Sequence, residues 1–188
     1  MMTLGLLQPE GEIETQRLIL RPMQETDIDA LHLIFTDPGV TASFGIEPFS
    51  RDQMEGWLRR NLDHQSAFGY GLFSVILRES GTLIGDCGLE QMEVEGVRVA
   101  ELGYDFRSQY WNRGFATEAA SAVRDYAFAI LRLPRLISLI RVGNLASRRV
   151  AEKVGMSLVG ESMRHGTPYW TYSIEGPSKP PGESPAEP

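Results

Sequence analysis

The chain has 188 residues, of which 42% are hydrophobic and 23% are charged, a balance typical of a globular domain that can bury its own core. Twenty-five acidic against eighteen basic residues leave a formal net charge of −7, which argues against a protein that coats nucleic acid, because phosphate contacts need clustered cations. Because Cys87 is the single cysteine, an internal disulfide and a thiolate zinc site are excluded. The three histidines are scattered along the chain and do not favour a metal centre. No apolar run approaches the roughly 20 residues of a membrane span.

The two ends of the chain differ in composition from its middle. Residues 176–188 contain five prolines and no large apolar side chain, so they cannot bury enough surface to offset the entropy of ordering. Residues 1–12 lack the basic flank and the long apolar stretch of a signal peptide, and we expect a flexible segment in a cytoplasmic protein. The sequence therefore predicts one folded domain over residues 13–175, followed by a disordered proline-rich tail.

Within the domain, hydrophobic periodicity alternates between the strand and the helix pattern. Pro22 ends the first strand because it cannot donate to a ladder, and Asp37-Pro38-Gly39 is expected to stop the first helix. Ser50 and Gln53 form a capping box for a second helix. In chain order we expect a strand over 16–21, a helix over 27–36, a helix after Ser50, strands over 71–78, 82–92 and 97–106, a helix over 115–131, a strand over 135–142, a helix over 146–154, and strands over 157–164 and 168–174.

Residues 104–119 read YDFRSQYWNRGFATEA, which predicts a strand, a turn and an entrance of small residues to the longest helix. The first amides of a helix lack intrahelical acceptors and stand at its positive end, so an anion can bind there where side chains are small. Gly114 and Ala116 provide that access, and Arg113 adds a cation. By itself the pattern is equally consistent with phosphate binding and with a plain structural turn.

This segment resembles the pyrophosphate loop of the GCN5-related N-acetyltransferases (GNATs), whose pattern Q/R-x-x-G-x-G/A falls here on residues 111–116. Trp111 departs from the Gln or Arg of the first position, and an aromatic residue there resembles the RimJ/RimL-type branch. Two further blocks are similar to that branch, in the same order and spacing. They are residues 14–22 (ETQRLILRP) and residues 144–156 (NLASRRVAEKVGM), where Met156 stands in place of the common Phe.

The resemblance implies the α/β (α+β) GNAT fold, a mixed and mostly antiparallel central sheet of about seven strands flanked by about four helices. It also implies a splay between the fourth and fifth strands, which are residues 97–106 and 135–142 here. The implied donor is acetyl-CoA, with no metal. The residues that it would contact are Tyr104, Phe106, Trp111, Asn112, Arg113, Gly114, Phe115, Ala116, Thr117, Asn144 and Ser147.

The implied function is that of an N-acetyltransferase that moves an acetyl group to a primary amine by direct attack in a ternary complex. The acceptor is either a peptide or protein N-terminus or a small-molecule amine, the enzyme is a monomer or a homodimer, and neither nucleic acid nor a membrane is a partner. A non-catalytic acyl-CoA-binding module of the same fold is the alternative.

Two residues are candidates for proton transfer. Glu101 lies within an apolar strand, on the face of Gly103 and opposite Leu102, and is a candidate base; a solvated or salt-bridged carboxylate is an equally weighted alternative. Ser147 matches the N-x-x-S position, whose hydroxyl the resemblance places near the CoA sulfur, and a role at the N-cap or in the first turn of a helix is the alternative. The basic residues within 148–153 face either the adenosine phosphates or solvent.

Overall fold

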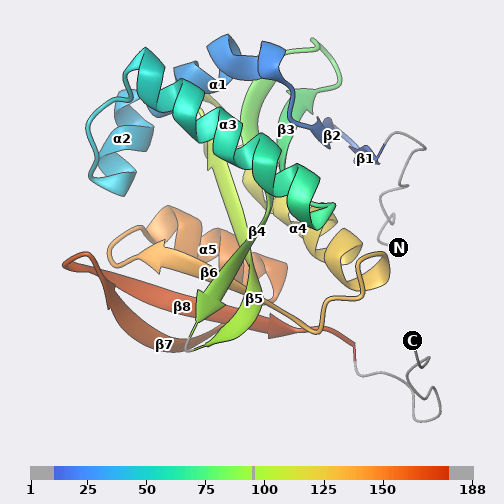
Figure 1. Ribbon diagram of the computed structural model, residues 1–188, viewed down its shortest axis with the longest axis vertical. Coiled ribbons are helices and arrows are strands. Elements are labelled where there is room, and N and C mark those ends of the chain that lie inside the picture. Colours follow the sequence, from blue (N-terminus) through green and yellow to red (C-terminus); the bar gives the residue numbers. More distant parts are fainter. Residues whose placement is uncertain (1–10, 95, 178–188) are drawn as a thin grey trace.

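The computed structural model describes residues 11–94 and 96–177, which form five α-helices and one eight-stranded sheet (Figure 1). The strands are β1 (Ile13–Glu14), β2 (Leu18–Pro22), β3 (Leu72–Leu77), β4 (Leu83–Val94), β5 (Val97–Phe106), β6 (Arg135–Arg141), β7 (Ser157–Arg164) and β8 (Thr167–Glu175). The helices are α1 (Ile28–Phe35), α2 (Pro38–Phe44), α3 (Arg51–Phe68), α4 (Phe115–Ala129) and α5 (Leu145–Val154), with short 3-10 turns η1 (Glu25–Asp27) and η2 (Ser108–Tyr110). The predictions for residues 1–12 and 176–188 fall mostly outside these described ranges.

The sheet is antiparallel except where β5 meets β6. Its order is β1-β2-β3-β4-β5-β6-β8-β7, so β6 joins β5 after the α4 crossover, and β8 lies between β6 and β7. β5 and β6 pair only at Ala100–Leu136 and Glu101–Ile137, whereas β6 pairs with β8 along its whole length, from Arg135 to Arg141. Beyond Glu101 the two parallel strands part, which confirms the predicted architecture and its splay.

Alternation along the strands divides the apolar side chains between two cores. On β3, Phe73 packs in the core that α4 and α5 cover, and its neighbour Leu72 packs in the core beneath α1 and α3. On β5, Leu102 packs in the α4 core, so Glu101 and Asp105 face the side of α1–α3. In Figure 1, α3 crosses in front of the long strands β4 and β5, and α4 lies on their far side, partly hidden.

The tripeptide Asp37-Pro38-Gly39 begins a helix as well as following one. α1 ends at Phe35, close to the predicted position, but Asp37 then caps α2, its carboxylate accepting the N–H of Gly39 at 2.8 Å. Pro38 suits the first helical turn, where its missing N–H is not needed. The predicted stop of the first helix is therefore confirmed, whereas the helix that begins at Pro38 was not predicted. With α2 and the two-residue strand β1, the described residues form five helices and eight strands, where about four and about seven are predicted.

None of the helices in the described part of the chain is long and apolar enough to cross a membrane. Across residues 11–94 and 96–177, no group of three or more His, Cys, Asp or Glu side chains is arranged to hold a metal ion.

Candidate active site

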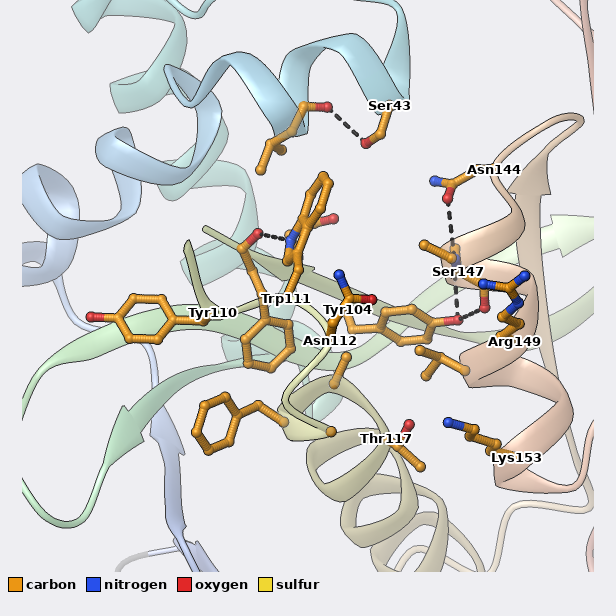
Figure 2. A pocket seen from close by; sticks show the side chains of 18 of the residues that line it. Ser43, Tyr104, Tyr110, Trp111, Asn112, Thr117, Asn144, Ser147, Arg149 and Lys153 are labelled. Carbon is orange, nitrogen blue, oxygen red and sulfur yellow. Dashed lines mark hydrogen bonds between the residues drawn. The ribbon is translucent and has the colours of Figure 1, made fainter. Parts of the chain in front are cut away.

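A cavity of about 390 Å³ lies where β5 and β6 part (Figure 2). Its walls come from the end of β5, the loop that leads into α4, the first turn of α4, one face of α5 along its length, and α2. Every residue predicted to contact the donor lines this cavity except Arg113. Of the two candidates for proton transfer, Ser147 lines it and Glu101 lies deeper along β5.

The N-terminus of α4 opens into the cavity. Gly114 is the N-cap residue and has a φ of 81°, in the left-handed region that glycine adopts without strain. The amide of Glu118 bonds to the carbonyl of Gly114 at 3.0 Å, so the amides of residues 115–117 precede the helix's own hydrogen bonds. Arg149 and Lys153 of α5 line the same cavity with cationic side chains. Amides at a helix start together with two cations fit a phosphate-bearing ligand.

The segment before β2 holds this helix start from outside the cavity. The carboxylate of Glu118 accepts hydrogen bonds from the hydroxyl of Thr15 at 2.7 Å, the amide of Arg17 at 2.8 Å and Nε of Arg17 at 2.7 Å. Arg17 also donates to the carbonyl of Arg113 at 3.0 Å, and its guanidinium lies 4.4 Å from the ring centroid of Phe115. Burial alone raises the pKa of Glu118, but the bonds from Thr15 and Arg17 hold it below its ordinary value. Two of the sequence blocks that resemble the family, residues 14–22 and 104–119, therefore contact each other in the structure.

A hydrogen-bonded link connects β5 to α5 across the splay. The hydroxyl of Tyr104 donates to the carbonyl of Ser147 at 2.8 Å and accepts from the hydroxyl of Ser147 at 3.1 Å (Figure 2). Asn144 is the N-cap of α5, and its Oδ1 accepts the amide of Ser147 at 3.1 Å. Ser147 thus lies in the first turn, while its hydroxyl turns toward Tyr104. Burial raises the pKa of Tyr104, so its phenol remains protonated.

Glu101 stands at the apex of the splay, in the last residue pair that β5 forms with β6. Its Oε1 accepts the amide of Leu139 at 3.1 Å, just beyond that pair. Burial raises the pKa of Glu101 to about 7, against the opposing effects of the Leu139 amide and Arg164. A carboxyl with this pKa can both accept and release a proton near neutral pH.

Two residues of the loop make contacts within the protein. The indole Nε1 of Trp111 donates to the carbonyl of Phe106 at 2.6 Å, inside the cavity. The guanidinium of Arg113 lies 5.1 Å from the ring centroid of Phe115 and 5.9 Å from that of Tyr110. Arg113 therefore does not line the cavity, and the cationic side chains in the cavity wall are those of Arg149 and Lys153.

Some cavity residues lie outside the sequence prediction. Val40, Ser43 and Phe44 come from α2, and the N-cap and proline signal at Asp37-Pro38 is the pattern that identifies this helix. Asp105 was also not predicted, although the two-residue alternation of β5 places its side chain on the same face as Glu101.

Comparisons with known proteins agree with this arrangement. The family model of the acetyltransferase (GNAT) domain matches residues 17–157. YkkB of Bacillus subtilis is 35% identical over 152 residues, which cover 80% of this chain and 87% of the relative. The N-acetyltransferase p20 of Bacillus licheniformis is 33% identical over 151 residues, covering 78% of this chain and 82% of the relative. The crystal structure of an acetyltransferase from Agrobacterium tumefaciens is 30% identical, has a TM-score of 0.76, and covers 90% of this chain and 97% of its own.

Proposed function

The chain belongs to the GNAT family of acetyltransferases, and we propose that it moves the acetyl group of acetyl-CoA to a primary amine, which attacks directly within a ternary complex. The resemblance to the RimJ/RimL-type branch belongs to the same proposal. The observation that supports it is the cavity at the splay, because this cavity is lined by the start of α4 and by Ser147, and the part of β5 that lines it begins three residues after the buried Glu101, whose pKa is about 7.

The cavity residues fit a donor that is long and carries phosphates at one end. The amides of residues 115–117, with Arg149 and Lys153, would hold the pyrophosphate and adenosine phosphates. The edge of β5 freed by the splay would bond the pantetheine arm through backbone groups near Tyr104 and Phe106. When bound, acetyl-CoA supplies a thioester carbonyl that is activated toward amines.

Glu101 is the proposed base. An ammonium group must lose a proton before its nitrogen can attack, and reference pKa values are about 7.7–8.0 for an α-amine and about 10.4 for a lysine-like amine. Glu101 takes this first proton, directly or through water, and the neutral nitrogen then bonds to the thioester carbon. The carbon–sulfur bond breaks and the nitrogen releases its second proton to solvent, which yields the amide and the CoA thiolate.

Ser147 is the proposed donor of a proton to that thiolate. Its hydroxyl lines the cavity and points to the phenol of Tyr104, which is itself fixed by the bond to the Ser147 carbonyl. A sulfur anion in the cavity is a stronger acceptor for the serine proton than a neutral phenol oxygen.

The position of Cys87 supports direct attack over a covalent acetyl-cysteine route. Cys87 is the chain's single cysteine and is fully buried in the α4 core. Burial raises the pKa of its thiol well above the ordinary value, and the thiolate is the form that attacks thioesters.

The test is an acceptor panel with acetyl-CoA, read as free thiol and as acetylated product by mass spectrometry. The panel contains peptides with different N-terminal residues, amino acids and alkylamines, since the acceptor is either an N-terminal or a small-molecule amine. We expect thiol release with at least one class and initial rates that fit a ternary complex. Tight CoA binding without release to any amine would instead identify an acyl-CoA-binding module.

A further inference from the structure

The tripeptide Asp37-Pro38-Gly39 attaches α2 to the turn that leads into the donor loop, residues 111–117. α2 has seven residues, and a helix this short is not stable by itself in water, so contacts with the rest of the domain hold it in place. Val40, Ser43 and Phe44 of α2 line the cavity. The contacts at the two ends of α2 therefore set the position of this cavity wall.

At the start of α2, one carboxylate bonds to both segments. Oδ1 of Asp37 accepts the amide of Gly39 at 2.8 Å, which caps α2. Oδ2 of Asp37 accepts the amide of Ser108 at 2.8 Å and the hydroxyl of Ser108 at 2.9 Å. Burial raises the pKa of Asp37, but the hydrogen bonds from Ser108, Gly39 and Val40 hold it below its ordinary value. Each oxygen of this carboxylate thus serves a different segment of the chain.

Glycine at position 39 lets the two segments approach closely. A Cβ on residue 39 would lie 2.7 Å from Cβ of Ser108, which is too close for two carbon atoms unless the backbone shifts. Pro38 occupies the first helical position, where no N–H is needed. Asp37 and Gly39 therefore both contact Ser108, and Pro38 between them begins the helix.

Ser108 belongs to the same turn as the start of the donor loop. It begins η2, and its carbonyl accepts the amide of Trp111 at 3.0 Å. The indole of Trp111 donates to the carbonyl of Phe106 at 2.6 Å, at the end of β5. A shift of Ser108 therefore displaces Trp111, which lies in the cavity wall.

The C-terminal end of α2 makes a packing contact instead. Gly45, the C-cap residue, has a φ of 64°, and the guanidinium of Arg141 from β6 lies where a Cβ of residue 45 would be. An arginine side chain can change its rotamer and follow a helix that moves. The hydrogen bonds of Asp37 are therefore the attachment that fixes α2 relative to the donor loop.

We propose that Asp37 is a positioning residue that holds α2 and the donor loop in one arrangement, so that CoA bound at the loop also stabilises α2 as a wall of the cavity. The inference rests on the proposed function, because that function places CoA at the donor loop. A ligand stabilises the arrangement to which it binds. Because Asp37 joins α2 to Ser108, the arrangement that CoA favours includes α2 in its place beside the cavity.

The variant Asp37→Asn separates the link to Ser108 from the cap of α2. The oxygen of asparagine still caps a helix, but its NH2 group then faces the amide of Ser108, and two donors cannot bond to each other. We expect Asp37→Asn to bind CoA about tenfold more weakly in calorimetry, because a charge-assisted link is lost. Asp52→Asn is the matched control, since Asp52 also lies in the first turn of a helix, α3, and its side chain is exposed.

Hydrogen exchange at saturating CoA, read by mass spectrometry, shows whether CoA acts on α2. In the wild type and in Asp52→Asn we expect CoA to slow exchange in the peptide that covers residues 38–45 by about tenfold, and in Asp37→Asn we expect this slowing to disappear. A residue that only stabilised the fold would change exchange by the same factor with and without CoA. Ser108→Ala loses the hydroxyl bond and keeps the amide bond, so it should give an intermediate result, and combining it with Asp37→Asn should add nothing further.

The outcomes separate this inference from the proposed acetyl transfer. If CoA binds and no amine releases thiol, the transfer fails, and the affinity and exchange measurements still test Asp37. If CoA does not bind the wild type, the donor site and this inference are both wrong.

Equal CoA affinity in the wild type and in Asp37→Asn, with both shown to be folded by circular dichroism, overturns the inference. It is also overturned if CoA does not slow exchange of residues 38–45 in the wild type, or if the slowing persists in Asp37→Asn. If Asp37→Asn does not fold, Ser108→Ala decides by the same two measurements.

Discussion

Replacing Glu118 by glutamine separates the contacts that hold the start of α4 from those inside the cavity. Glu118 lies outside the cavity lining and accepts three hydrogen bonds from Thr15 and Arg17, which precede β2. Glutamine keeps an oxygen for the Thr15 hydroxyl and the Arg17 amide, so the change removes mainly the charge-assisted bond from Nε of Arg17. The loop that positions residues 115–117 then loses one of its attachments.

The magnitude follows from the exposure of the pair. A hydrogen bond to a charged group contributes about 1.5–3 kcal/mol, and we reduce this to about 1–2 kcal/mol because the Arg17 side chain is 43% exposed. That free energy is a factor of about 5–30 in an equilibrium. The free energy of the lost hydrogen bond sets the upper limit on how far the loop's equilibrium can move away from its binding-competent arrangement. We therefore expect KM for acetyl-CoA to rise by no more than about 5–30-fold, with little change in kcat.

Urea unfolding gives the stability, and calorimetry gives the affinity for CoA. The depressed pKa of Glu118 stabilises the fold above the carboxyl's ordinary pKa, and this contribution disappears as the pH falls through the lowered value, so wild type and variant should converge in acid. Glu55→Gln is the matched control, since Glu55 pairs with Arg51 on the exposed side of α3, and we expect no change there. Unchanged affinity for CoA despite reduced stability would refute the idea that this contact positions the loop.

Three further predictions concern the cavity. In Glu101→Gln we expect kcat to fall by about 10²–10⁴-fold, and the rise of kcat with pH up to about 7 to disappear from the pH–rate profile, because the ionised carboxylate is the active base; a rise that persists in the variant assigns it to another group. Gly114→Asp should abolish CoA binding in calorimetry, because the new carboxylate repels phosphate. Gly81→Asp is the control for backbone strain, since Gly81 has a φ of 68° in a turn with open space around it. Normal CoA binding by Gly114→Asp would show that the phosphate site is assigned to the wrong place. Tyr104→Phe removes the link from β5 to Ser147, so we expect a loss of about 1 kcal/mol in the free energy of unfolding and slower thiol release, and an unchanged release rate would speak against Ser147 as the proton donor.

Elements with their own periodicity could be predicted from the sequence. The strand over 97–106 coincides with β5, and the helix over 115–131 with α4, apart from two residues at its end. α2 marks the limit, because seven residues make barely two turns and their apolar pattern carries little weight beside a proline and a glycine. Only the cap signal distinguishes this helix from a loop, yet α2 supplies one wall of the cavity.

The residues of the site divide in the same way. The glycine and small residues of the α4 entrance act through local backbone geometry, so a motif suffices to identify them. The contacts of Glu101 with Leu139 and of Tyr104 with Ser147 join segments about forty residues apart in sequence. The local pattern of one segment does not indicate which residue of the other it will contact.

The sequence by itself determined the family, the order of the elements apart from β1 and α2, and the place where the α4 helix starts, because each depends on neighbours within a few turns of chain. The tertiary structure alone decided that Glu101 stands at the apex of the splay, and that Asp86 and Asp105 lie opposite each other, where within the described residues neither oxygen of Asp86 has a hydrogen-bond partner. Both depend on strand register, and a shift by one residue would turn these carboxyls to the opposite face of the sheet. Register and burial are set by the packing of the whole domain, and together with neighbouring acids they raise the pKa values of Asp86, Glu101 and Asp105 above those of ordinary carboxyl groups.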